Sequence, residues 1–284
     1  MFKKIKEQHI LLAPPAFWLL LFFIIPIFIV IGYSFNIGVA GSSPGFTFDY
    51  YRQALQGMYI GIFLKSFVYA LVTTILTLCI AFPMAYFMAF ASARTKLLIM
   101  FLIILPFWTN FLIRMYAIMT LLGDSGLLNS ALLYTGIIGE PLKMINNSFG
   151  MYVGFVYWNL PFMVLPVFSS LDRMDVSLLE ASLDLGASRR QTFMKITLPY
   201  AVPGLVAGII FTFIPTLGNF VIPEFLGGTE NTMIGNVITA QYLQARNWPF
   251  GSALSTVLMF VIMIFISLYI RFFDPTKSKN TITF

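Results

Sequence analysis

The segment DRMDVSLLEASLDLGASRRQTFMKITLP, residues 172–199, lies between two long apolar runs and carries two helix-start signals. Ser177 precedes Glu180 at the spacing of a helix capping box, and Ser188 precedes Gln191 at the same spacing. In such a box the serine hydroxyl caps the first turn, and the acidic or amide side chain bonds back to the cap residue. The segment therefore predicts two short helices.

The residues between and after these helix starts complete the pattern. Leu179 and Leu183 give the first helix an apolar stripe. Gly186 favours the end of that helix, because glycine adopts the left-handed backbone of a helix C-terminus at little cost. Pro199 marks the start of the next apolar run. The predicted unit is a helix, a tight turn and a second helix at the edge of that run.

The composition places this unit in a membrane protein. Hydrophobic residues make up 59% of the 284 residues and charged residues 10%, whereas soluble domains carry about 25% charged residues. The formal net charge is +6, but the basic residues lie between apolar runs rather than in one patch, which argues against nucleic-acid binding. Cys79 and His9, the single cysteine and histidine, offer no disulfide framework and no metal cluster.

Several apolar stretches are long enough to cross a bilayer as helices, which takes about 20 residues each. The first is too long for the hydrophobic region of a typical signal peptide, so we expect it to be retained as a span. The sequence predicts an all-α membrane protein, surrounded by lipid, with six spans at residues 11–34, 66–90, 97–122, 149–171, 200–222 and 252–272.

The basic residues indicate the orientation, because cytoplasmic loops are enriched in Lys and Arg. With six spans both termini share one side, and residues 172–199 lie on that side too. We therefore predict a bacterial inner-membrane protein with both termini in the cytoplasm. Twelve basic residues fall on that side, namely Lys3, Lys4, Lys6, Arg94, Lys96, Arg173, Arg189, Arg190, Lys195, Arg271, Lys277 and Lys279, against four on the other, Arg52, Lys65, Lys143 and Arg246.

The segment at 172–199 resembles the EAA loop of bacterial ABC-importer permeases, which reads Glu-Ala-Ala, three residues, Gly, nine residues, Ile, one residue, Leu-Pro. The resemblance implies a type I (MetI-like) permease fold and a loop that docks into a groove on a separate ATPase subunit. The third position departs from the pattern but keeps a small residue. The matching residues are Glu180, Ala181, Ser182, Gly186, Ile196, Leu198 and Pro199.

The chain lacks the Gly-rich phosphate loop with which many ATPases bind nucleotide. We therefore expect a transport subunit that is not itself an enzyme and binds no cofactor, with ATP used by a partner subunit. The expected parts are residues 1–64, with the N-terminal tail, first span and outer loop; residues 65–272, the ABC transmembrane type-1 core; and residues 273–284, the cytoplasmic C-terminal tail.

Segments outside this loop resemble the spermidine/putrescine importer permeases of the PotB type. These are PFWTNFLIR at 106–114, LPFMVLPVFSS at 160–170, IGNVI at 234–238 and NWPFG at 247–251. The resemblance implies a second permease subunit of the PotC type, a dimer of the ATPase subunit and an external polyamine-binding protein.

A path for a polyamine should offer carboxylates, aromatic faces and amide oxygens. Glu224, after the fifth span, is the acidic candidate, or else a solvated outer-loop carboxylate. Trp108 and Asn110 are candidates on the third span, although a tryptophan there also serves as an interfacial anchor or packing residue. Asn219 is a candidate on the fifth span, where helix–helix hydrogen bonding is the alternative.

Two further features concern helix packing. Arg114 lies inside the third span, where an arginine costs about 2.5–3.5 kcal/mol on insertion scales. We expect a structural or gating role near the outer end of the span, with an acidic residue as its candidate partner. Gly204 and Gly208 have the spacing of a close helix contact, either within the subunit or against the second permease.

Other functions are open to a chain of this kind. An importer permease for another small solute, such as a metal chelate, a phosphonate or an amino-acid-like compound, would share the loop. A membrane-embedded enzyme would need clustered ionisable groups or a nucleophile motif, which the sequence lacks. An ion-coupled secondary carrier would usually show paired intramembrane carboxylates and inverted repeats rather than a docking loop.

Overall fold

The computed structural model describes residues 14–37 and 45–273, and within these ranges the regular structure is helical, without strands. The chain divides into two compact units, each built from two pieces of sequence. The first unit comprises Met1–Gly61 and Val237–Met263, and the second comprises Ile62–Asn236 and Ile264–Phe284.

The first unit contains the π-helical turn η1 (Leu20–Ile24), α2 (Ile25–Ser34), α3 (Asp49–Ala54), most of α12 (Ile234–Leu243) and the start of α13 (Trp248–Phe273). Hydroxyl groups join its helices in pairs. The Ser34 and Tyr51 hydroxyls lie 2.6 Å apart between α2 and α3. The Tyr242 and Ser252 hydroxyls lie 2.8 Å apart between α12 and α13.

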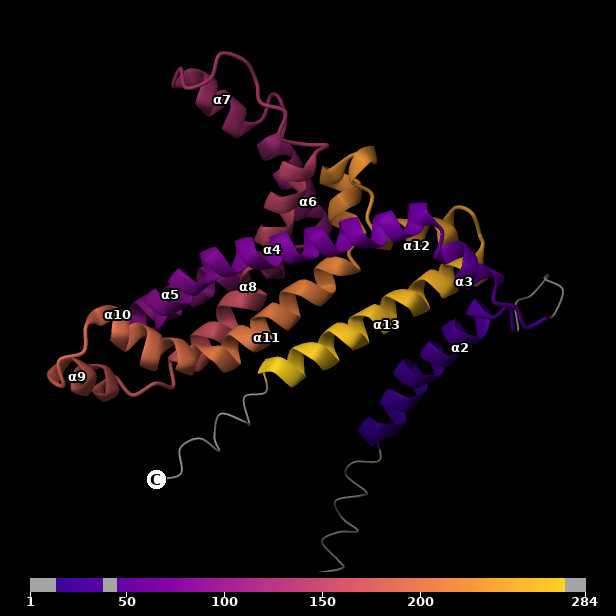
Figure 1. The fold of residues 1–284 in the computed structure, drawn as a ribbon. Helices are drawn as coiled ribbons and strands as arrows, with labels where there is room; N and C mark the ends of the chain where they lie inside the picture. The colour runs from indigo at the N-terminus through magenta and orange to yellow at the C-terminus, as the bar shows by residue number, and fades with distance from the viewer. Residues whose placement is uncertain (1–13, 38–44, 274–284) are drawn as a thin grey trace, which may run out of the picture. The chain divides into compact units, whose positions relative to one another are not determined.

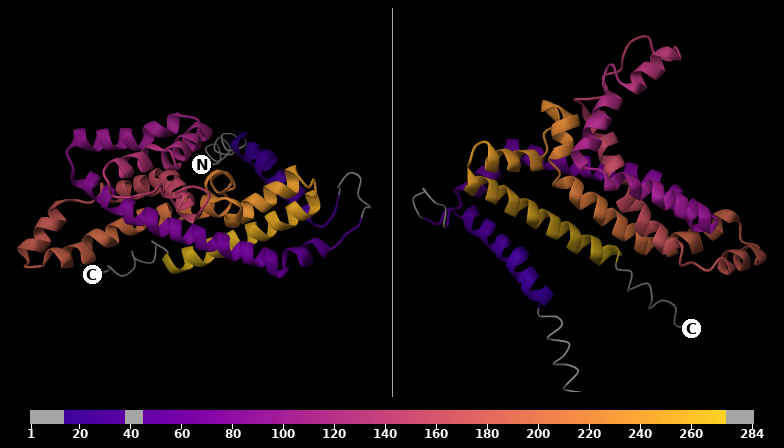
Figure 2. Two further views of the ribbon diagram at one scale, coloured as in Figure 1. Left: turned by 90° about the horizontal axis from the view of Figure 1, so that it is seen from above. Right: turned by 180° about the vertical axis from the view of Figure 1, so that it is seen from behind.

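The second unit holds the remaining helices, with α4 entering it at Ile62, and also the end of α13. In Figures 1 and 2, α4, α5, α8 and α11 run side by side, α9 and α10 lie at one end of this bundle, and α6 and α7 project from the other end. The elements are α4 (Gly57–Phe90), α5 (Ala93–Ile104), η2 (Leu105–Trp108), α6 (Phe111–Leu122), α7 (Leu127–Tyr134), α8 (Ser148–Leu171), α9 (Ser177–Asp184), α10 (Arg189–Thr192), η3 (Phe193–Thr197), α11 (Leu198–Leu217), η4 (Pro223–Gly227) and η5 (Thr229–Asn231).

Six segments of the described chain are long and apolar enough to span a membrane, which confirms the predicted number. The first, fourth and sixth overlap the predicted spans closely. The second begins nine residues earlier than expected, and the fifth begins eleven residues earlier and ends five residues earlier. The segments are Pro14–Ser34, Gly57–Phe90, Phe111–Tyr134, Ser148–Leu171, Arg189–Leu217 and Trp248–Arg271.

The third apolar stretch is not the continuous helix predicted over residues 97–122. The structure divides it into α5, the 3₁₀ turn η2 and α6, with an extended connection that ends at Asn110. Pro106 has no N–H with which to continue the helical ladder. Asn110 then starts a new helix, because its side-chain oxygen accepts a hydrogen bond from the Leu112 N–H at 2.8 Å. The candidate span here is Phe111–Tyr134, which contains α6 and α7.

The two central helices α8 and α11 pack closely through glycine. A Cβ atom on Gly204 would lie 2.4 Å from the Pro166 carbonyl oxygen, and one on Gly208 would lie 2.6 Å from the Met163 sulfur. The absence of side chains at these two positions therefore lets the backbones approach. This confirms the close contact predicted from the glycine spacing and shows that it is made within the chain.

Candidate functional site

The first helix of the EAA-type segment (residues 172–199) is capped differently from the prediction. α9 begins at Ser177, so this residue lies inside the helix instead of capping it. Asp175 does the capping, since its carboxylate accepts a hydrogen bond from the Ser177 N–H at 2.9 Å. The backbone and side-chain hydrogen bonds from Ser177 hold the pKa of Asp175 below its usual value. An aspartate two residues upstream competes with the serine for the cap.

The turn after α9 has the form predicted for Gly186. Its φ angle is +83°, in the left-handed region that glycine adopts without strain. The Gly186 N–H donates to the Leu183 carbonyl at 2.9 Å, and the Ala187 N–H donates to the Ser182 carbonyl at 3.1 Å. These two bonds form a Schellman motif, which fixes the direction in which the chain leaves α9.

The second helix begins as predicted but does not end before the fifth span. Ser188 and Gln191 form the capping box, with both of its hydrogen bonds present. From Arg189 the chain remains helical through α10, the π-helical turn η3 and α11, as far as Leu217. Pro199, predicted to mark the entry to the fifth span, lies in the first turn of α11, two residues after the end of the wider π turn η3. A π turn changes the hydrogen-bond register locally, so it accommodates the missing N–H of proline.

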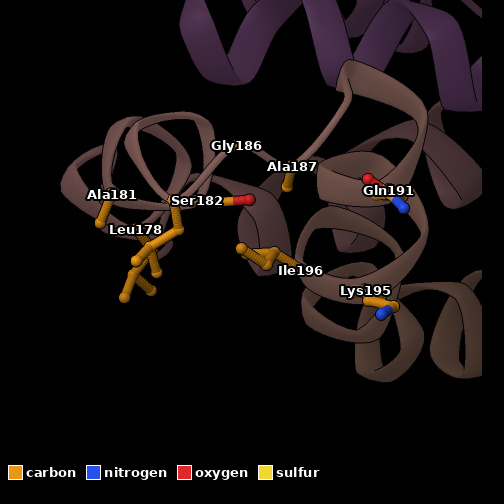
Figure 3. Close-up of a pocket in the computed structure, with 9 residues that line it drawn as sticks. Leu178, Ala181, Ser182, Gly186, Ala187, Gln191, Lys195 and Ile196 are labelled. Carbon is orange, nitrogen blue, oxygen red and sulfur yellow. The ribbon is translucent and has the colours of Figure 1, made fainter.

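The two halves of the EAA-type segment are joined across the turn. The hydroxyls of Ser182 on α9 and Thr192 on α10 lie 2.8 Å apart. Beside this contact lies an open groove of about 520 Å³ between α9 and the start of the long helix. Figure 3 shows its walls, which include Leu178, Ala181 and Ser182 on one side, Gly186 at the turn, and Lys195 and Ile196 on the other side.

The outer surface of the EAA-type segment is apolar at several positions. Leu185 is 88% exposed, and Leu183 and Val176 are also exposed. The Glu180 carboxylate is exposed, and no described residue pairs with it. Exposed leucines on a rigid support, beside a groove and an unpaired carboxylate, are suited to docking with another protein.

The EAA-type segment is tied to the bundle at its start. The Lys96 ammonium on α5 forms an ion pair with the Asp172 carboxylate at 2.5 Å. The Ser170 hydroxyl at the end of α8 donates to the Tyr200 carbonyl on α11 at 2.7 Å. The ion pair therefore joins the start of the segment to α5, and the hydrogen bond holds together the two helices that flank the segment.

The predicted path residues lie near two helix breaks in the second unit. The first break is the connection between η2 and α6, and the second lies between the end of α11 and η4. Asn110 caps α6 after the break in the third span. Asn219 follows the end of α11, and its side-chain oxygen accepts a hydrogen bond from the Ile222 N–H at 3.0 Å. Asn219 therefore caps a local turn rather than bonding to another helix. Trp108 lies beside the first break and is 77% exposed, with its ring 6.4 Å from that of Phe101.

Glu224 lies in η4, after the second break, and its side chain is exposed. The Asn236 amide group donates to its carboxylate at 3.1 Å. The rings of Tyr116 on α6 and Phe225 on η4 meet edge to face, with centroids 5.4 Å apart. The structure thus brings α6 and the Glu224 turn together, while showing no contact of Trp108 with Glu224. The sequence analysis did not identify Asn236 and Tyr116 as neighbours of this turn, because sequence spacing does not reveal which turns of separate spans meet.

Arg114 is buried, and among the described residues no acidic side chain forms the ion pair that was expected for it. Its guanidinium packs instead against the rings of Phe107, Phe111 and Trp158. Aromatic faces attract a guanidinium through their quadrupole, so they replace the carboxylate that the charge of Arg114 suggested.

Three curated permeases are similar to almost the whole chain. The spermidine/putrescine transport system permease protein PotB of Salmonella typhimurium (strain SL1344) is 39% identical over 268 residues, covering 94% of this chain and 93% of that protein. The PotB protein of Escherichia coli K12 is 40% identical over 256 residues, with coverages of 89% and 93%. The PotB protein of Haemophilus influenzae is 37% identical over 268 residues, with coverages of 94% each.

The fold matches solved transporters. A chain of a bacterial alginate ABC transporter, in complex with an alginate-bound periplasmic protein, aligns with a TM-score of 0.75 and 17% identity, covering 95% of both chains. A second structure of an alginate-importing ABC transporter aligns with a TM-score of 0.70 and 20% identity, with coverages of 96% and 98%. The family model described as "Binding-protein-dependent transport system inner membrane component" matches residues 56–279. The chain therefore belongs to the family of binding-protein-dependent transport system inner membrane components.

Proposed function

We propose that this chain is the permease subunit of an ATP-driven importer that moves polyamines of the spermidine and putrescine class across the bacterial inner membrane by alternating access. The EAA-type segment carries the proposal, because it forms a rigid, partly apolar surface that continues as helix into the fifth span. The substrate class is supported by 37% to 40% identity with three PotB permeases over nearly their full lengths.

The proposed assembly contains a second permease subunit of the PotC type, a dimer of ATPase subunits and an external polyamine-binding protein. ATP is bound and hydrolysed by the ATPase subunits, and this chain supplies no cofactor site. Both termini and the EAA-type segment face the cytoplasm in this arrangement. The excess of basic residues on that side supports the orientation.

The geometry of the EAA-type segment suggests how force would pass from the ATPase to the membrane. A side chain of the ATPase would enter the groove beside Ser182, and Leu185 would supply apolar contact. The Schellman turn and the Ser182–Thr192 contact keep α9 and α10 together. Because the helix from Arg189 to Leu217 has no break, displacement of α10 is transmitted directly to α11. Glu180 remains available for a cation of the ATPase.

The proposed substrate path runs beside the two helix breaks. Glu224 provides a carboxylate whose orientation is set by Asn236. Tyr116 and Trp108 provide exposed aromatic surface on and beside α6. A protonated amine is stabilised by a carboxylate and by aromatic faces, and an extended polyamine can use several such sites in succession. The Asn110 oxygen already caps α6 and the Asn219 oxygen already caps a local turn, so we assign both residues to shaping the path.

The second candidate function is an importer permease for a different small solute, because such a permease would carry the same EAA-type segment. The test is uptake of radiolabelled solutes in a strain lacking this gene, with and without the gene restored. Restored uptake of spermidine or putrescine, with unchanged uptake of amino acids, phosphonates and metal chelates, is the expected result. Unchanged polyamine uptake in the deletion would overturn the substrate assignment. Collapse of uptake by an uncoupler at constant ATP would instead indicate an ion-coupled carrier.

A further inference from the structure

The aromatic clamp around Arg114, formed by Phe107, Phe111 and Trp158, joins three helical elements. The guanidinium carbon lies 4.7 Å from the Phe107 ring centroid, 4.8 Å from that of Trp158 and 5.9 Å from that of Phe111. Trp158 also meets the Phe107 ring at 5.4 Å and the Phe111 ring at 4.5 Å. These contacts connect η2, α6 and α8 around a charge that is 7% exposed.

The clamp spans the point where the third apolar stretch is broken. Thr109 and Asn110 have extended backbones, with ψ angles of 153° and 138°, so helical hydrogen bonds do not fix the angle between η2 and α6. Phe107 precedes this connection and Phe111 follows it. Because Arg114 contacts both rings, its side chain restrains the angle across the break. Trp158 ties the same pair of rings to α8.

The clamp leaves part of the guanidinium unsatisfied. The Nε and Nη1 atoms of Arg114 are buried, and no described residue accepts a hydrogen bond from either. Leaving the donors of a charged group unpaired away from water is costly, although the ring faces compensate for some of that cost. An arrangement that offers oxygen acceptors to these two donors would recover part of that cost.

We infer that Arg114 and its three rings form a state-dependent latch, which holds the break in the third span against α8 in one transport state and opens in the other. Arg114 is thus a positioning residue that touches no substrate. The inference rests on the proposed transport cycle, in which the helices of the bundle rearrange when ATP is bound and hydrolysed. It does not depend on which solute is carried.

Distance measurements in the assembled transporter test the latch. Spin labels are placed at Ile113 on α6 and Ser169 on α8, both exposed, after Cys79→Ser removes the native thiol. We expect two distance populations whose ratio changes between the nucleotide-free and the vanadate-trapped transporter. Arg114→Met should lower the population at the distance of this structure roughly 10- to 30-fold relative to the other, as expected for loss of a desolvated cation–π contact.

Two further variants make the outcome decisive. Trp158→Leu, which leaves Arg114 in place but removes the ring on α8, should shift the ratio in the same direction. Arg94→Met, the same change at an exposed arginine on α5, should leave it unchanged. A single distance in both nucleotide states, or equal ratios in wild type and in the clamp variants, would overturn the latch. Failure of polyamine uptake alone would count against the proposed substrate and leave these distances informative.

Discussion

The hydroxyl oxygens of Ser182 and Thr192 lie 2.8 Å apart and join α9 to α10 beside the Gly186 turn. Serine is the departure of this chain from the Glu-Ala-Ala pattern, and the contact gives that departure a structural role. Ser182→Ala should raise hydrogen exchange of the α9 amides about fivefold, since such a bond contributes about 1 kcal/mol. Transport should persist, because alanine is the residue of the EAA pattern.

Thr192→Val should raise the same exchange rates by a similar factor. Because both variants remove one shared bond, the double variant should exchange no faster than either single variant. Additive effects in mass-spectrometric exchange measurements would show that the two hydroxyls act independently.

Replacement of Gly186 should uncouple transport without removing the protein from the membrane. A Cβ atom at this position would meet nothing within 4 Å, so the effect comes from the φ angle of +83° rather than from a clash. Gly186→Val should abolish uptake, because a β-branched residue is strained there and would redirect α9. Gly186→Asn is the control and should retain much of the uptake, since asparagine tolerates this conformation. Equal uptake by both variants would contradict this role of the turn.

The contact between α8 and α11 should be sensitive to one added methyl group. Gly204→Ala places a Cβ against the Pro166 carbonyl, which belongs to the backbone and yields little, so a loss of about 1–3 kcal/mol is expected. Gly218→Ala is the matched control, because nothing lies within 4 Å of its added carbon. The measurement is the thermal midpoint of the purified protein in detergent. Equal midpoints for the two variants would contradict the packing described here.

The cap of α9 should weaken at acid pH. The pKa of Asp175 is lowered by its hydrogen bonds from Ser177, so the ionised form stabilises the helix above the ordinary value of 3.8. That stabilisation is lost as the pH falls below 3.8 and through the depressed pKa. Amide exchange at the start of α9, corrected for intrinsic rates, should accelerate in this range in wild type. Asp175→Asn should show no such dependence, and a matching acceleration in that variant would exclude Asp175 as the cause.

The carboxylate of Glu224 should affect substrate handling more than coupling. Glu224→Gln is expected to raise the KM for spermidine uptake about tenfold, equivalent to roughly 1.4 kcal/mol. The ATPase activity of the assembled transporter without substrate should be unchanged, because Glu224 lies outside the EAA-type segment. Asn236→Ala should have a smaller effect in the same direction. An equal loss of uptake and of substrate-independent ATPase activity would argue against a place in the path.

Sequence patterns predicted the EAA-type segment well, because its signals are local. The capping box at Ser188 and the left-handed Gly186 depend on residues within one turn of each other. One local prediction failed where two signals competed, because Asp175 replaced Ser177 as the cap of α9.

Features that depend on the whole chain or on tertiary contacts were harder to predict from the sequence. The third span reads as one apolar run, and apolar length alone does not show its division at Pro106 and Asn110. An acidic partner was expected for Arg114, whereas aromatic rings contact it. One of these rings, Trp158, comes from a different span, and sequence spacing does not show which spans meet. Likewise, no spacing rule brings Asn236 to Glu224.

The most direct test of the coupling role is a crosslink from Leu185, the most exposed leucine on the turn side of α9. Leu185→Cys in a Cys79→Ser background is assembled with the other subunits and treated with a short thiol-to-amine crosslinker. The result we predict is an adduct with the ATPase subunit, which Leu127→Cys on α7 does not form. Absence of that adduct, or labelling of the introduced thiol from the periplasmic side of intact cells, would contradict the coupling role.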